Sequence, residues 1–466
     1  MPPVLALMIW LVLLLGLLCF DPAREPGTSF ALWIPLLWML IIGSRLPSQW
    51  FGLQVGSLAQ AMSEGNPLDR TIDLAMIVIS VAVLATRSFN WSGFLLRNLA
   101  LTAFVMFALL SIVWSDFPFV AFKRWFRDLG NYLVILVVLT DPRPLEAVRA
   151  LLRRFSYFLI PLSIVLIKYY PGMSRQYDPW TGSFADAGVA TSKNMLGVVC
   201  LVSGIFFVWD TLTRWPDRKE RRTKKILLVD LAFLAMTLWV LNLTKSATSG
   251  VCLAIGSLVI WMVKTGWGRR HSGLIKVMIP TGFCLYLVLA FGLNLNGELA
   301  QRLGRDPTLT DRTLIWNTVL SIRTNPLVGT GYESFWLGPR LDRIWEITGR
   351  VNEAHNGYLE VYLNLGLVGL SLLTGFLLTG YRNTCKELAL HSELASLTLA
   401  VWTSFLFYNM TEAAFKSHPM WFIFLLGSIA IPKLTEDRAP QAYIKEDGRR
   451  RIRKFSFETR MQRGTH

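Results

Sequence analysis

Long apolar runs alternate with short polar segments along most of the 466-residue chain. An apolar run of about 17–25 residues can span the hydrocarbon core of a bilayer as a helix, whereas a shorter run usually does not. The runs predict twelve or thirteen spanning helices, of which the one at 129–141 is short. They lie at 3–20, 28–44, 71–86, 96–114, 129–141, 154–169, 192–212, 226–243, 247–264, 275–293, 357–380, 394–411 and 419–432.

The composition supports the same class of protein. Hydrophobic residues make up 53% of the chain and charged residues only 17%, which is more apolar surface than a soluble domain of this length can bury. The run at 3–20 is interpreted as a span, because no basic segment precedes it and no good cleavage site follows it. The sequence therefore predicts an all-α polytopic membrane protein with a large outer loop. We divide it into N-terminal helices at 1–70, a central bundle at 71–293, the outer loop at 294–356, C-terminal helices at 357–432 and a basic tail at 433–466.

Short loops rich in Lys and Arg indicate which side of the membrane is cytoplasmic. These loops are 141–154, 213–225, 268–273 and 448–454. With spans that alternate between them, the segments 115–128, 170–191 and 294–356 fall on the opposite, periplasmic side. The net charge of +16 follows mainly from this bias and from attraction to membrane lipids with anionic headgroups. Nucleic-acid binding is disfavoured, because the basic residues are scattered over loops and form no single patch.

Several basic residues are nevertheless predicted on the outer side, against this bias. They are Lys123, Arg124 and Arg127 in the segment 115–128, and Arg302, Arg305, Arg312 and Arg323 in the long segment. A planar guanidinium donates paired hydrogen bonds to phosphate oxygens, so the group as a whole indicates an anionic ligand. For any single residue, contact with lipid headgroups or with a nearby aspartate (Asp128, Asp306 or Asp311) is an equally good interpretation.

The long outer segment contains one predicted amphipathic helix. Thr310 can cap a helix that begins at Asp311, and the Asn-Pro pair at 325–326 ends it. Such a helix is typical of the membrane interface. Arg312 and Trp316 share one face of it. We interpret Trp316 as an interfacial anchor, while Arg312 is either a snorkelling side chain or a ligand-binding one.

The stretch NEAHNGYLEVYLNLGLVG at 352–369 places polar residues at the start of a predicted span. At about 100° per residue, Asn356, Glu360 and Asn364 form one stripe, and His355 lies at the outer end. Polar groups at this depth are costly unless they face the bundle interior or a water-filled cleft. The glycines at positions 357, 366 and 369 would allow close contact with another helix. An imidazole at this place can accept a proton from a sugar hydroxyl; the alternative is a structural residue at the helix end.

The sequence shows no motif for a metal or a nucleotide. The five cysteines lie in predicted spans or in a cytoplasmic loop, so we expect no disulfides. No Cys/His cluster has zinc spacing, no acidic or His/Cys cluster is evident on the outer side, and no Gly-x-x-x-x-Gly-Lys loop occurs. We therefore expect no metal, no other cofactor and no ATP-driven step.

Four motifs in order give the chain a resemblance to the O-antigen ligase and Wzy-type polymerase superfamily, especially its exopolysaccharide polymerase-like branch. They are SIVWSDFPFVAFKR at 111–124, GVATSKNMLG at 188–197, GRDPTLTDRTLIW and NPLVGTGYESF within 304–335, and AHNGYLEVYLNLGLVG at 354–369. Together with the spacing of the helices, the resemblance extends over most of the chain. It implies a GT-C-type glycosyltransferase of the bacterial inner membrane that is metal-independent, inverts the anomeric centre and works at the periplasmic face.

The resemblance also implies substrates and site residues. The donor would be a glycan on undecaprenyl diphosphate, and the acceptor a hydroxyl of a growing polymer or of the lipid A core. His355 would be the base, with Tyr358 or Glu360 orienting or hydrating it. Arg312 would bind the diphosphate. Helpers and further substrate-binding candidates are Arg305, Lys193, Asn194, Lys123, Arg124 and Asn356. The chain departs from the family pattern at Asp311, where glycine is usual, and at Lys245, where arginine is frequent.

A transporter or flippase of lipid-linked oligosaccharides is the alternative function. Such a protein needs charges through its core and alternating access, which internal repeats or broken helices often betray. Here the unexpected charge is predicted on the outer side, and the sequence has no evident repeat, which favours the transferase. Ligase and polymerase share these site residues and differ in the acceptor, so the sequence leaves that choice open.

Overall fold

The computed structural model of the chain describes residues 1–431 apart from 22, 24–26, 54–64, 179–182, 293–311, 350 and 391–392. Contacts divide the chain into two units. The larger comprises 1–89 and 98–429, and the smaller comprises 90–97, with helix α6 (Trp91–Arg97), and the residues from 430 onward. The fold and the sites described below belong to the larger unit.

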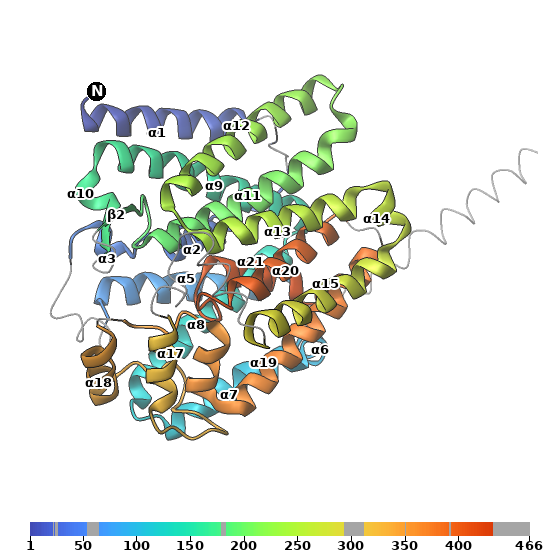
Figure 1. Cartoon of the computed structure of the whole chain (residues 1–466). Helices are drawn as coiled ribbons and strands as arrows, with labels where there is room; N and C mark the ends of the chain where they lie inside the picture. Colours follow the sequence, from blue (N-terminus) through green and yellow to red (C-terminus); the bar gives the residue numbers. More distant parts are fainter. Residues whose placement is uncertain are drawn as a thin grey trace, which may run out of the picture. The chain divides into compact units, whose positions relative to one another are not determined.

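Helices make up most of the larger unit, as the apolar runs predict (Figure 1). The prediction of an all-α polytopic membrane protein is confirmed. The helices are α1 (Pro3–Phe20), α2 (Trp33–Gly43), α3 (Pro47–Trp50), α5 (Pro67–Thr86), α7 (Leu99–Leu110), α8 (Pro118–Leu139), α9 (Pro144–Tyr169), α10 (Pro171–Ser174), α11 (Lys193–Arg214), α12 (Arg221–Thr244), α13 (Ala247–Lys264), α14 (Gly266–Arg270), α15 (Ser272–Leu287), α17 (Arg312–Ser321), α18 (Gly338–Thr348), α19 (Gly357–Ala389), α20 (Ala395–Tyr408) and α21 (Pro419–Ser428). Short helical segments of other types lie at Phe30–Leu32, Ser111–Trp114, Trp215–Asp217 and Val288–Gly292.

Seven of the described helices are long and apolar enough to cross a membrane, namely α1, α9, α11, α12, α13, α15 and α19. Helix α5 meets the same test together with α6, and four shorter apolar segments coincide with the spans predicted at 28–44, 96–114, 394–411 and 419–432. The total of twelve or thirteen spans stays a prediction. Within the span that contains α11, 83% of the apolar window is buried, against 11% for α1 and α15. We therefore place α11 at the centre and expect α1 and α15 to face lipid.

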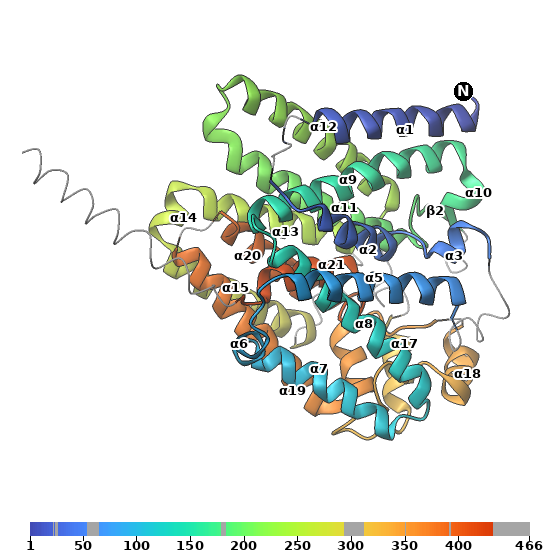
Figure 2. The ribbon, with the colours of Figure 1, turned by 180° about the vertical axis from the view of Figure 1, so that it is seen from behind.

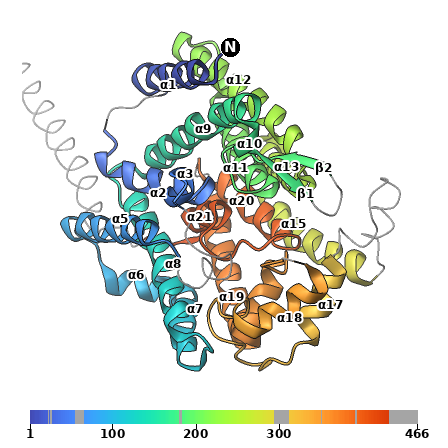
Figure 3. The ribbon, with the colours of Figure 1, turned by 90° about the vertical axis from the view of Figure 1, so that its left-hand side faces the viewer.

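Segments predicted on opposite sides of the membrane lie at opposite ends of the larger unit. In Figure 1, α10, the β-hairpin and α18 lie at the left-hand end, whereas α14 and the turn between α11 and α12 lie at the right. Figure 3 looks onto the first end, with the hairpin and α10 above α17 and α18. The hairpin pairs β1 (Arg175–Asp178) with β2 (Ser183–Asp186) in antiparallel register. This separation is the one that the basic loops predict.

The basic segment 115–128 was predicted to be an outer loop. In the structure, most of it forms the first half of α8. Pro118 occupies the first turn of that helix, where its missing N–H costs no helical hydrogen bond. The helix packs against α5 and α21 (Figure 2). Arg127 pairs with Asp73 of α5, its Nε lying 3.1 Å from Oδ2. These contacts keep the basic stretch helical and continuous with the short span predicted at 129–141.

Helix α19 is broken at Gly366, which has a φ of +64°. The turn at 326–331 lies against this break and pairs with it through backbone atoms. The hydrogen bonds run from Thr330 N to Leu363 O (3.2 Å), from Gly331 N to Asn364 O (2.9 Å) and from Leu367 N to Pro326 O (2.9 Å). A Cβ added at Gly366 would lie 2.3 Å from the carbonyl carbon of Leu327. This glycine therefore admits a loop, and not the neighbouring helix that the sequence suggested.

The outer segment folds over a small hydrophobic core that it shares with the start of α19. Its members include Ile315, Val319, Trp336, Leu341, Ile344 and Leu363. Helix α17 begins at Arg312, so the predicted helix is present, although Thr310 and Asp311 lie outside the described residues and its amphipathic character stays a prediction. Helix α18 and the β-hairpin were not predicted.

Candidate active site

Buried hydrogen bonds hold the backbone around His355. This residue follows Ala354, which is fully buried, and precedes Asn356, the N-cap of α19. The Ala354 N–H donates to Glu360 Oε1 (2.5 Å), and its carbonyl accepts from Trp316 Nε1 (2.8 Å). His355 has a φ of +48°, a left-handed conformation that is uncommon for a residue with a side chain and persists only where its surroundings support it.

The imidazole of His355 faces two carboxylates. Its Nδ1 lies 3.2 Å from Glu353 Oε1 and 3.4 Å from Glu412 Oε2. Burial lowers the pKa of His355, but the hydrogen bond with Glu412 and the charges of both carboxylates outweigh burial, so the pKa is raised above its ordinary value. The side chain is 30% exposed. With Nδ1 engaged, Nε2 is the ring nitrogen left for a substrate.

Glu412 joins His355 to Arg312. Arg312, the first residue of α17, donates from Nη2 to Glu412 Oε1 at 2.8 Å. Asn194, at the start of α11, donates to the same oxygen at 2.9 Å. The side chains of Arg312 and Glu412 are only 14% and 7% exposed. Arg312, the predicted diphosphate ligand, and Asn194, a predicted substrate-binding residue, therefore meet the predicted base around one largely buried carboxylate.

Glu353 has a cation of its own. The Nζ atom of Lys416 lies 2.9 Å from Glu353 Oε2. Burial raises the pKa of Glu353, but Lys416 and His355 outweigh burial and lower it to about 2. Burial and Lys416 lower the pKa of His418 to about 3. At neutral pH the site therefore contains a charged Glu353–Lys416 pair beside a neutral His418, which caps α21 by accepting the Met420 N–H (3.2 Å).

Two residues predicted to assist the base make structural contacts. The buried carboxylate of Glu360 accepts from Trp336 Nε1, with its two oxygens at 3.0 and 2.9 Å, and from the Ala354 N–H. It therefore supports the backbone ahead of the imidazole. The Tyr358 hydroxyl donates to Leu406 O of α20 at 3.2 Å. Among the described contacts, neither side chain bonds to the imidazole itself.

Three other predicted ligand-binding residues are Asn356, which follows His355 in the chain, and Arg124 and Lys123 on α8. Asn356 caps α19 by accepting a backbone N–H of its first turn (3.1 Å). On α8, Arg124 donates to the backbone carbonyl of Glu333. Lys123 lies over the ring of Phe119, 5.0 Å from its centroid.

Three further predictions have separate outcomes. Lys193 begins α11, one residue before Asn194. Arg305 lies outside the described residues, so its role stays a prediction. Trp316 bonds through its indole N–H to Ala354 and packs its ring on the core of the outer segment, and its role as an interfacial anchor stays a prediction.

Glu353, His355 and Glu412 place one ligand atom each within 4.8 Å of one another, close enough to share a metal ion. The expectation that the outer side lacks such a cluster is therefore wrong. Each carboxylate already has a cation, Arg312 at Glu412 and Lys416 at Glu353. The charge of the cluster is thus compensated without a divalent ion, and we assign none.

Sequence reasoning missed Glu412 and Lys416. They belong to the segment NMTEAAFKSH at 409–418, between the last two predicted spans. By alternation of the spans, this short segment falls on the outer side, so a glutamate and a lysine in it were a usable signal. Which residues they meet depends on tertiary packing.

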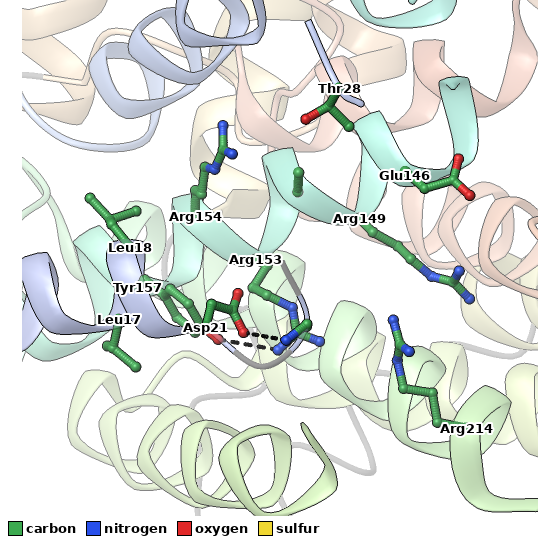
Figure 4. A pocket seen from close by; sticks show the side chains of 12 residues that line it. Leu17, Leu18, Asp21, Thr28, Glu146, Arg149, Arg153, Arg154, Tyr157 and Arg214 are labelled. Carbon is green, nitrogen blue, oxygen red and sulfur yellow. Dashed lines mark hydrogen bonds between the residues drawn. The ribbon is translucent and has the colours of Figure 1, made fainter. Parts of the chain in front are cut away.

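A second polar cluster lies between α9, α11 and α12, beside a cavity of about 40 Å³ (Figure 4). Arg153 lies between Asp210 and Asp230, with nitrogen–oxygen distances of 2.5 and 2.6 Å. Arg149 and Arg214 also pair with Asp210. The cavity has room for a few waters. Because these arginines face carboxylates, we interpret the cluster as a buried ion network that joins the helices.

Comparison with known proteins bears on the first of these sites. Residues 231–374 match the family model described as O-antigen ligase, and this range contains Arg312, His355 and Glu360. The chain is also 27% identical over 296 residues to the exopolysaccharide production protein ExoQ of Rhizobium meliloti. That match covers 61% of this chain and 65% of the relative, so it spans slightly less than two thirds of the relative's length.

Proposed function

We propose that the protein is a glycosyltransferase of the bacterial inner membrane, because residues 231–374 match the family model described as O-antigen ligase. It transfers a glycan from undecaprenyl diphosphate to a sugar hydroxyl at the periplasmic face. The contact of Arg312 and His355 with one carboxylate, Glu412, carries the proposal. Glu412 thereby joins Arg312, which is suited to binding a diphosphate, to His355, which is suited to accepting a proton from a hydroxyl. The name of the relative, an exopolysaccharide production protein, favours a growing polymer over the lipid A core as acceptor.

In the proposed reaction, His355 Nε2 takes the proton of the acceptor hydroxyl while the hydroxyl oxygen attacks the anomeric carbon of the donor. The bond between that carbon and the diphosphate oxygen breaks, and the diphosphate leaves with the electron pair. Arg312 and Asn194 donate hydrogen bonds to the departing charge, so neither a metal nor a general acid is required. Attack opposite the leaving group inverts the anomeric centre.

The remaining candidates have narrower proposed roles. Glu360 is a positioning residue that acts through the backbone of Ala354. Lys193 and Arg305 help to hold the diphosphate, and Lys123, Arg124 and Asn356 contact the glycan or the lipid headgroup. Tyr358 fixes the start of α19 against α20.

Arg312→Lys tests the proposal. The lysine keeps the charge but loses the planar fork, so turnover should fall by about 10–100-fold, the effect of losing a charge-assisted hydrogen bond. Purified protein in lipid nanodiscs would be supplied with the lipid-linked donor, and the product measured by gel electrophoresis. Arg343→Lys, at an exposed position of α18 in the same outer segment, is the matched control and should retain turnover. Near-normal product from Arg312→Ala would show that the diphosphate binds elsewhere.

A further inference from the structure

The carboxylate of Glu412 has two different sets of partners. Oε1 accepts from Arg312 Nη2 (2.8 Å) and from Asn194 Nδ2 (2.9 Å), whereas Oε2 lies 3.4 Å from His355 Nδ1. The side chain is 7% exposed, so these partners and not solvent satisfy most of its hydrogen-bonding capacity. One side chain therefore contacts both halves of the site, the anion-binding half and the base.

Glu353 provides an internal comparison, because it touches the same imidazole. Its Oε1 lies 3.2 Å from His355 Nδ1, but its Oε2 pairs with Lys416. Among the described contacts, Glu353 has no bond to Arg312 or Asn194. Both carboxylates thus contact His355. Only Glu412 also accepts hydrogen bonds from Arg312 and Asn194 among the described contacts.

Donor binding has a direct consequence for Glu412. A diphosphate that approaches Arg312 and Asn194 must compete with Oε1 for the same N–H groups. It also brings negative charge close to a buried carboxylate, and like charges a few ångströms apart repel strongly where water is excluded. The carboxylate must therefore give up these donors when the diphosphate takes them, while His355 Nδ1 remains within reach.

We propose that Glu412 is a positioning residue that couples donor binding to the base. Without donor, it occupies Arg312 and Asn194 in the manner of an internal anion. When the diphosphate displaces Oε1, the Glu412 carboxylate keeps His355 as its partner, tightens the 3.4 Å contact between Oε2 and Nδ1, orients the imidazole and stabilises the imidazolium that forms when Nε2 takes the acceptor proton. Donor binding therefore strengthens a contact with the base that already exists without the donor. This inference rests on the proposed function and adds regulation of the same site.

The proposal predicts opposite effects of one substitution on binding and on turnover. Glu412→Gln keeps the size of the side chain and removes its charge. Undecaprenyl diphosphate should bind about tenfold more tightly, as expected when one competing charge near a partly exposed site is lost. Turnover with the lipid-linked donor should fall at least about tenfold, because the imidazolium loses a charged partner. A side chain with a merely structural role would weaken binding and turnover together.

Binding of undecaprenyl diphosphate to the full-length protein in nanodiscs would be measured by isothermal titration calorimetry, and turnover by product formation. Glu353→Gln is the matched variant: it should lower turnover without tightening binding. Glu393→Gln, whose exposed side chain pairs with Arg149 outside the site, should change neither. Unchanged or weaker binding by Glu412→Gln, or equal tightening by Glu353→Gln, overturns the inference.

Two further results keep the test decisive. If Glu412→Gln does not accumulate, Glu412→Asp shortens the reach by one methylene. It should still tighten binding and slow turnover, and unchanged values for both would refute the coupling. If Arg312→Ala and His355→Ala remain active, the proposed function itself fails. If they are inactive but Glu412→Gln does not bind more tightly, only the coupling fails.

Discussion

The imidazole of His355 can accept a proton only in its neutral form, and its neighbours favour the charged form. Burial lowers its pKa, but Glu412 and Glu353 raise it by more, while Arg312 acts with burial. The ring is therefore a stronger base than an exposed histidine, yet fewer molecules hold it neutral at neutral pH. The same carboxylates that hold the ring thus also set the pH at which it works.

Turnover should accordingly rise with pH through a value above about 6.5, the ordinary pKa of histidine. Glu353→Gln removes one negative charge beside Nδ1, lowers the pKa of His355 and moves the rising limb to lower pH. The measurement is the rate against pH at saturating donor. Glu393→Gln should leave the limb in place. A limb that stays fixed or moves to higher pH in Glu353→Gln would contradict the role of His355 as base.

His355→Ala removes the base itself. Loss of a general base costs about 10²–10⁴ in rate, whereas the proposed diphosphate ligands Arg312 and Asn194 remain, so donor binding should persist. Product formation and calorimetric binding of undecaprenyl diphosphate would be compared with those of His271→Ala, a histidine in the short connection from α14 to α15. Loss of the variant from the membrane, or an unchanged rate, would show that His355 is a structural residue.

The cluster of Glu353, His355 and Glu412 also allows a direct test of metal dependence. Because Arg312 and Lys416 already balance the two carboxylates, turnover should continue in excess chelator. The assay would compare product formation with chelator, without chelator, and after chelation followed by addition of magnesium or manganese. Activity that disappears and returns with the ion would show that these three residues hold a metal.

At the scale of elements, the break in α19 decides how the outer segment is attached. The first turns of α19 carry Glu360 and Asn364, and the break at Gly366 follows directly. The turn at 326–331 fits into this break. Because Trp336 and Phe335 bond to Glu360 and Asn364, the outer segment is also joined to α19 between His355 and the break at Gly366.

Gly366→Ala should disrupt this attachment. An added Cβ would meet the Leu327 backbone at 2.3 Å, and alanine is strained at a φ of +64°, so unfolding should become easier by at least about 1–3 kcal/mol. The temperature of thermal unfolding in detergent and the rate of product formation should both decrease. Gly375→Ala, in the same helix but with nothing within 4 Å of the added atom, is the control. Equal behaviour of the two variants would argue against a strained break.

The elements also show what the sequence could and could not predict. Helices α17 and α19 follow from apolar periodicity and from end signals, which are local. Helix α8 was misread because charge counting assigns basic residues to loops, whereas tertiary contacts such as Arg127–Asp73 keep them helical. Helix α18 exposes most of its polar residues and buries few apolar ones. Motif resemblance identified Arg312 and His355, but Glu412 joins them through contacts between distant segments.

At the scale of the whole molecule, the larger unit has two differently charged ends. The end with α14 and the α11–α12 turn carries the basic loops that favour the cytoplasm. The other end carries α17, α18 and the candidate active site. We propose that the second end faces the periplasm. A polymer formed there need not cross the inner membrane again.

Reporter fusions test this orientation. A reporter active only in the cytoplasm should be active when fused after Lys219, in the α11–α12 turn, and silent when fused after Asn325, in the outer segment. A reporter active only in the periplasm should give the reverse pattern and serves as the control for expression. The opposite result for both reporters would place the candidate active site on the cytoplasmic side.

The pairing of the turn at 326–331 with α19 has a consequence for which substitutions the outer segment can tolerate. The attachment uses main-chain N–H and carbonyl groups, which every residue except proline supplies alike. Side chains along this turn can therefore drift during evolution while the outer segment keeps its place, provided that Gly329 and Gly366 remain. Substitutions of the exposed side chains in this turn should therefore leave the backbone around His355 in place.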